Sequence, residues 1–175
     1  MPNTNRQQTV YVGSGNPDTV NDSSLYAGGE LGMALDWDNR AYQLVQCDSG
    51  AVAGGTGAVA NKDLAYWKDK TKYLVTNSLV NALGGSSEGR NQVAGVFRTI
   101  VGGGNFCFVL QRGDKTAVKS DGNGSAGDSA IADSTTAQVT NVAAGSAPTY
   151  QKIGVVRGAA SGGFINVDFD IPNIP

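Results

Sequence analysis

The chain has 175 residues, of which 40% are hydrophobic and only 16% are charged, with a formal net charge of −2 and a pI near 4.9. This length suits one domain with a core of its own, or a domain with an arm. The sparse, slightly acidic charge gives no electrostatic reason to bind nucleic acid, because phosphate neutralisation needs clustered Lys and Arg. No run of 18 apolar residues occurs, so we predict no membrane partner or span.

The first 30 residues are predicted to form an N-terminal arm and loop, and residues 31–175 a single β domain. Residues 1–8 are polar and indicate an extended arm, residues 8–12 alternate like a strand, and a loop rich in turn formers follows. Gly28, Gly29 and Gly32 weaken a helix over residues 24–35. A loop followed by a strand is therefore expected there.

Two hairpins are predicted next, joined by a linker-like stretch of small residues at 49–61. The first has strands over 31–36 and 41–48 about a turn at 37–40, and the second has strands over 64–69 and 72–77 about a turn at 68–71. Further along, we expect a turn at Gly113-Asp114, a polar loop at 120–129, and short strands at 130–133 and 138–142. About ten to twelve strands with almost no helix are typical of a sandwich or barrel. The predicted fold class is all-β, an antiparallel β-barrel or sandwich with an extended N-terminal arm.

The segments 92–110 and 151–169 resemble each other at an offset of 59 residues, and each predicts a strand, a glycine-rich turn and an alternating strand. An internal duplication would make the two hairpins superpose, with equivalent glycines at the turns. Chance likeness between glycine-rich hairpins is the alternative. The identical positions are Gln92/Gln151, Gly95/Gly154, Val96/Val155, Arg98/Arg157, Gly103/Gly162 and Gly104/Gly163.

The sequence contains no histidine and two cysteines, Cys47 and Cys107. Histidine is the usual base of serine and cysteine hydrolases and the commonest metal ligand, so its absence argues against these enzymes and against a zinc site. The N-terminus lacks the apolar segment of a secretory signal, and we expect a cytoplasmic, reducing setting. Two free, buried thiols are then favoured over a disulfide. We predict a protein that is not an enzyme and has no catalytic, cofactor or metal site.

Two patterns are candidate ligand sites, and each has a plainer structural explanation. Asp121, Asn123 and Ser125 have the spacing of the first calcium ligands of an EF-hand, but position twelve is Ala132 instead of Glu, which favours a solvated loop. Trp37 lies between two carboxylates at a predicted hairpin tip and could stack on a sugar ring. Packing over its own sheet or on a neighbouring subunit is favoured.

The second part of the chain resembles the decoration, or cement, proteins of tailed bacteriophage capsids. The likeness covers residues 60–175 and is carried by YWKDKTKYLVTN (66–77), GRNQVAGVF (89–97), AGDSAIADSTTAQV (126–139) and QKIGVVRGAASGGFINVDFDIP (151–172). The resemblance implies a β-rich module on the outer surface of an icosahedral shell, where it bridges neighbouring capsid subunits and helps the shell resist the pressure of packaged DNA. It offers no catalytic residues to transfer.

The expected partners are the major capsid protein and further copies of the chain, as a homotrimer, with a dimer as the competing possibility. The chain ends are expected to reach these neighbours, since extension there disturbs no core and a monomer would leave the C-terminal isoleucines partly exposed. A carbohydrate- or receptor-binding β-domain of a phage fibre, contacting its ligand through Trp37, is the alternative function. The predicted interface residues are Thr4, Arg6, Val10, Tyr11, Trp37, Ile171, Pro172 and Ile174.

Overall fold

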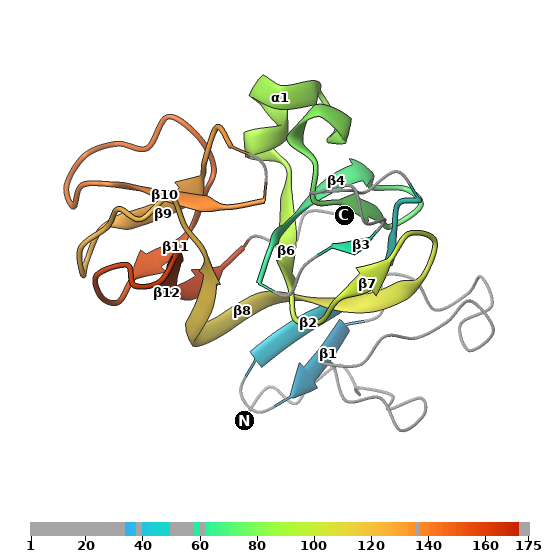
Figure 1. Cartoon of the computed structure of the whole chain (residues 1–175), viewed down its shortest axis with the longest axis horizontal. Coiled ribbons are helices and arrows are strands. Elements are labelled where there is room, and N and C mark those ends of the chain that lie inside the picture. The colour runs from blue at the N-terminus through green and yellow to red at the C-terminus, as the bar shows by residue number, and fades with distance from the viewer. Residues whose placement is uncertain (1–33, 38–39, 50–57, 60–61, 136, 172–175) are drawn as a thin grey trace, which may run out of the picture.

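The computed structural model describes residues 34–37, 40–49, 58–59, 62–135 and 137–171, and in this part the chain is built almost entirely of β-strands (Figure 1). The all-β prediction is therefore confirmed. Three short helical turns occur, and all of them lie in the segment 77–91 between two strands: η1 (Leu79–Asn81), α1 (Gly85–Glu88) and η2 (Gly89–Asn91). The predicted arm over residues 1–30 lies outside the described residues.

The described strands follow the alternating segments of the sequence. The predicted hairpins at 31–48 and 64–77 and the strands at 130–133 and 138–142 are confirmed, with ends that shift by a few residues. The strands are β1 (Ala34–Trp37), β2 (Arg40–Cys47), β3 (Ala58–Val59), β4 (Leu64–Asp69), β5 (Leu74–Thr76), β6 (Val93–Phe97), β7 (Val101–Gly102), β8 (Phe106–Lys119), β9 (Ser129–Ala132), β10 (Val139–Val142), β11 (Lys152–Val156) and β12 (Phe164–Asp170).

Ten of these strands form one sheet in the order β1-β2-β5-β4-β6-β8-β12-β11-β9-β10, and β3 pairs with β7 separately. Because β2 pairs with β8 as well as with β5, the strands β2, β5, β4, β6 and β8 close into a ring. Ring closure removes exposed strand edges. The β2–β5 pair is parallel, so the barrel is mixed instead of purely antiparallel. The long strand β8 leaves the ring to pair with β12, and Figure 1 shows it running between the ring and the group β9–β12.

Two core clusters lie on opposite faces of the shared strands. On β8, Phe106, Phe108 and Leu110 belong to the first cluster, whereas Cys107 and Val109 belong to the second. The first cluster extends over β9–β12, and the second draws residues from all five strands of the ring. Each large apolar side chain that is fully buried in this way stabilises the folded chain by about 1.5–3 kcal/mol, compared with leaving the side chain exposed to water. As predicted, the cysteines are free and buried, and both lie in the second cluster.

The two similar segments both form antiparallel hairpins, but their strands pair in different registers. In the first hairpin Val96 pairs with Leu110. The equivalent pair in the second would be Val155 with Phe169, whereas Val155 in fact pairs with Asp168. A slip of one residue turns side chains to the other face of a sheet. The prediction that the two hairpins superpose as duplicates is therefore wrong.

The consequence of this slip is visible in the cores. Ala94 and Phe97 on β6 belong to the second cluster, but their sequence equivalents Ile153 and Val156 on β11 belong to the first. Only the second strands of the two hairpins keep equivalent apolar positions on one core face.

The turns of the two hairpins also differ. Gly104 and Gly163 both adopt a left-handed backbone, with φ of +84° and +79°. Gly162 is left-handed as well, but Gly103 is not, and a Cβ on Gly103 would lie 2.6 Å from the backbone of Ser49. The first turn is drawn into the small β3–β7 sheet, which has no counterpart in the second hairpin among the described strands.

The predicted turn at Gly113-Asp114 is wrong, because β8 continues through both residues. Gly113 pairs with Phe169, and a Cβ there would lie 2.8 Å from Cγ of Arg40. Glycine serves a close approach at this position, so the chain does not reverse.

Candidate functional site

The predicted interface residues fall largely outside the part of the chain that the structure describes. Trp37 pairs with Arg40 at the end of β1, but its side chain is not described. Ile171 is 4% exposed and packs in the first core cluster, where its N–H donates to the carbonyl of Gln111 at 2.9 Å. The expectation that a monomer leaves Ile171 partly exposed for a neighbour is wrong, because β12 carries the chain along β8 up to this residue. The remaining predicted residues outside the described part are Thr4, Arg6, Val10, Tyr11, Pro172 and Ile174.

Besides Ile100 and Phe164, which lie apart in the sequence, the exposed large apolar side chains of the described residues belong to a helical protrusion, defined as residues 77–91. It carries Val80, which is 71% exposed, and Leu83, which is 45% exposed. Figure 1 shows the protrusion at the outer end of the molecule, above β4 and β6. No helix or strand was predicted from the sequence between the strand at 72–77 and the segment 92–110. The run LVNAL at 79–83 was the available signal, because three large apolar residues within five exceed what one face of a short helix can bury.

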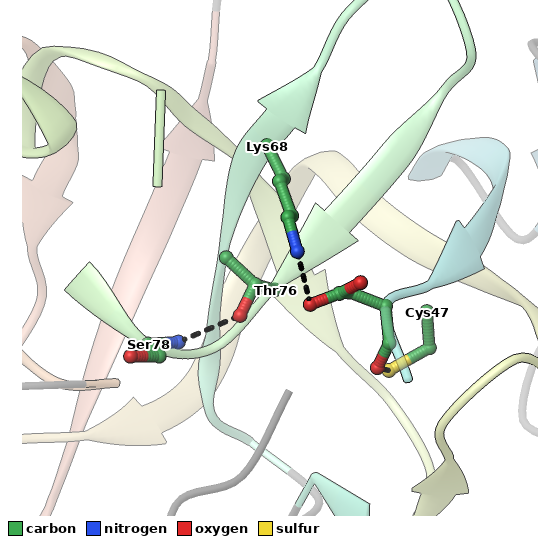
Figure 2. A network of polar contacts seen from close by, with 5 residues as sticks. Cys47, Lys68, Thr76 and Ser78 are labelled. Carbon is green, nitrogen blue, oxygen red and sulfur yellow. Dashed lines mark hydrogen bonds and ion pairs between the residues drawn. The ribbon is translucent and has the colours of Figure 1, made fainter. Parts of the chain in front are cut away.

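Both ends of the protrusion are fixed to the sheet. At its start, the Ser78 N–H donates to the Thr76 hydroxyl at 3.1 Å, a contact drawn in Figure 2. At its end, the Arg90 guanidinium donates twice to the carbonyl of Ala132, at 2.9 and 2.8 Å, and stacks over the ring of Tyr150 at 3.7 Å from the centroid. A cation over an aromatic face adds about 0.5–1 kcal/mol at an exposed site. The exposed side chains are thus presented from an anchored segment.

At the start of the protrusion lies a polar group that we call the Asp63 cluster, made of Asp63, Asn77 and Lys119. Asp63 is 1% exposed and Asn77 is fully buried. The Asn77 Nδ2 donates to Asp63 Oδ2 at 2.9 Å, and the Lys119 Nζ lies 3.9 Å from Asp63 Oδ1. The Asn77 Oδ1 is buried without a hydrogen-bond partner, which is unusual because buried polar atoms are normally satisfied. No sequence motif marks this cluster, since its members are far apart in the chain.

A second polar network joins β2 to β4 (Figure 2). Lys68 Nζ lies 2.8 Å from the nearly buried carboxylate of Asp48, and the Cys47 thiol lies 3.8 Å from the Asp48 carbonyl oxygen. Burial, with a smaller effect from the Asp48 charge, raises the pKa of the Cys47 thiol to about 12. Burial also raises the pKa of Cys107 well above its ordinary value. Both sulfurs are therefore neutral at physiological pH and unsuited to nucleophilic attack.

The candidate calcium loop is closed by hydrogen bonds within the chain. Asp121 accepts from the backbone and side chain of Asn123, both at 3.0 Å, and from the Thr140 hydroxyl at 2.8 Å. Partial burial raises the pKa of Asp121, but these hydrogen bonds outweigh it and lower the pKa below its ordinary value. In the part of the chain that the structure describes, no three metal-binding His, Cys, Asp or Glu side chains gather.

Comparisons of this chain with protein-family models, with curated proteins and with solved structures find no match. Within the described residues, none of the helices has the length and apolar character needed to cross a membrane.

Proposed function

We propose that this chain is a decoration protein of a tailed bacteriophage capsid, which binds the outer surface of the shell and bridges neighbouring major capsid subunits. The sequence resemblance supports this proposal, and apart from residues 136 and 172 its four segments lie in the described part of the chain. They cover most of the β4–β5 hairpin, the turn η2 with β6, β9 with the first residue of β10, and the whole β11–β12 hairpin.

The observation that carries the proposal is the anchored protrusion with two exposed apolar side chains. Burial of each of these two side chains, Val80 and Leu83, against a partner contributes about 1 kcal/mol to the binding free energy, since both are exposed in the isolated chain. Such a contact is weak alone. In a homotrimer seated on a capsid, each contact is repeated by symmetry, and linked weak contacts give a high overall avidity. The proposed mechanism is multivalent, non-covalent bridging.

The test is co-sedimentation with purified shells that lack this protein. We expect the wild-type chain to pellet with shells and the double variant Val80→Asp, Leu83→Asp to stay in the supernatant, because a charge in an apolar contact is costly. The double variant Ser146→Asp, Ala147→Asp is the matched control, since it adds the same two charges at exposed loop positions outside the protrusion. Circular dichroism checks that each variant is folded.

Two results would contradict this proposal. If the wild-type chain does not bind any shell, the decoration function is wrong. If the Val80→Asp, Leu83→Asp variant binds as tightly as the Ser146→Asp, Ala147→Asp control, the protrusion is not the contact surface.

A further inference from the structure

The Asp63 cluster brings an amine, a carboxylate and a carboxamide together from three separate parts of the chain. Asp63 precedes β4, Asn77 follows β5, and Lys119 ends β8. One oxygen of Asp63 accepts from the Asn77 amide at 2.9 Å, and the other lies 3.9 Å from the Lys119 Nζ. The carboxamide therefore hydrogen-bonds one oxygen of the carboxylate, and the amine forms a longer ion pair with the other.

From this arrangement we propose that Lys119 and Asn77 join in an intramolecular isopeptide bond, with Asp63 as the catalytic proton carrier. A nucleophilic lysine, an amide carbonyl and a group that can move protons between them are the parts that this acyl transfer needs. This inference does not depend on the proposed capsid function.

The reaction balances without any cofactor or oxidant. Asp63 Oδ1 takes a proton from the Lys119 ammonium. The resulting amine attacks Cγ of Asn77, which places negative charge on the Asn77 Oδ1. Asp63 returns the proton to Nδ2, and the second proton that Nζ loses follows the same route. The Nζ–Cγ bond forms, the Cγ–Nδ2 bond breaks, and Nδ2 leaves as an ammonium ion. Asp63 ends as the carboxylate with which it began.

The backbone holds the reacting groups in place. The Phe97 N–H donates to the Asp63 carbonyl at 3.0 Å, and the Lys119 N–H donates to the Lys62 carbonyl, also at 3.0 Å. These hydrogen bonds fix the backbone from which the Asp63 and Lys119 side chains extend. The remaining approach is made by the lysine side chain, whose four-carbon stem rotates freely and is 44% exposed.

The surroundings favour aminolysis over hydrolysis of the Asn77 amide. Asn77 is fully buried, and the neighbouring Tyr66 is also fully buried, so water has little access to Cγ. Burial raises the pKa of Tyr66 above its ordinary value, which keeps its hydroxyl neutral in this region. The Asn77 Oδ1, which has no partner in the unreacted chain, is the atom on which the negative charge develops.

The experiment is mass spectrometry of the isolated full-length chain. We expect the wild-type protein to be lighter than its calculated mass by one ammonia, and a tryptic digest to contain a branched peptide joining Asn77 to Lys119. The variants Lys119→Arg and Asp63→Asn should keep their calculated masses and give only linear peptides. Lys68→Arg is the matched control: it alters another lysine–aspartate ion pair, at 2.8 Å, and should still lose one ammonia.

Lys119→Arg preserves the positive charge, so it keeps the test informative if Asp63→Asn fails to fold. Three results would overturn the proposal: a wild-type chain at its full calculated mass, an ammonia lost with only linear peptides, or a loss of water that joins Lys119 to Asp63. A supporting result is a Tm for Lys119→Arg several degrees below that of Lys68→Arg, because a covalent link restricts the unfolded chain.

Discussion

Gly154 on β11 is expected to be among the least replaceable residues of this fold. It pairs with Phe169 on β12, and a Cβ built on it would lie 2.2 Å from the Asp168 carbonyl oxygen and 2.7 Å from Cγ1 of Val167. The close atom is backbone held in the ladder, so Gly154→Ala must push the two strands apart. Overpacking of this kind costs about 1–3 kcal/mol, and we expect the upper end. For a chain of this size, about 3 kcal/mol lowers Tm by about 6–12 °C.

Urea and thermal unfolding followed by circular dichroism measure this effect. Gly158→Ala is the matched control, because a Cβ there meets nothing within 4 Å and its backbone is not left-handed. The control should be unchanged or stabilised by up to about 1 kcal/mol, since alanine restricts the unfolded chain. If Gly154→Ala unfolds within about 0.5 kcal/mol of the wild type, the close approach of β11 and β12 does not constrain this position, and the reasoning fails.

Three further predictions follow from buried or hydrogen-bonded groups. Tyr66→Phe should change stability by less than about 1 kcal/mol, because the buried hydroxyl makes no hydrogen bond of normal geometry and only the nearby Ala137 backbone acts on it as a hydrogen-bonding group; a loss above about 1 kcal/mol in urea unfolding would contradict this. Cys47 and Cys107 should resist iodoacetamide at pH 9 in the native chain and react in urea, since burial raises both pKa values; rapid native labelling would contradict this. The pKa of the Asp128 carboxyl is lowered below its ordinary value of 3.8, chiefly by the hydrogen bond from the Ser125 N–H. The ionised carboxylate therefore stabilises the fold above pH 3.8, and this stabilisation is lost as the pH falls through the lowered pKa of the folded chain. In Asp128→Asn, Tm should therefore fall less steeply below about pH 4 than in the wild type. If Tm falls equally steeply in both, Asp128 is not the group responsible.

Local pattern predicted the strands but not their pairing. The alternation of Phe106, Phe108 and Leu110 marks one apolar face of a strand, and the structure places all three in one cluster. The same reasoning failed for the two similar hairpins, because identical residues at equivalent positions do not fix the register. Register depends on which neighbour each strand meets. β6 lies between β4 and β8, whereas β11 lies between β9 and β12.

In the candidate sites too, the sequence predicted less than the tertiary structure decided. Ile171 looks like an exposed apolar tail in the sequence, but pairing along β8 buries it in the core. Val80 and Leu83 are ordinary apolar residues in the sequence, and only the packing of Leu79 beneath them shows which side of the protrusion is left exposed. Asp63, Asn77 and Lys119 share no motif, so the Asp63 cluster was beyond prediction.

The sequence by itself determined the all-β class, the positions of most strands and the burial of both cysteines, because alternation, glycine content and turn residues act over a few neighbouring positions. The tertiary structure decided the closed ring, the parallel β2–β5 pair, the register of each hairpin and the meeting of Asp63 with Asn77 and Lys119. These features depend on contacts between residues distant in the chain. Such contacts are chosen by the burial of whole strand faces, which no local segment encodes alone.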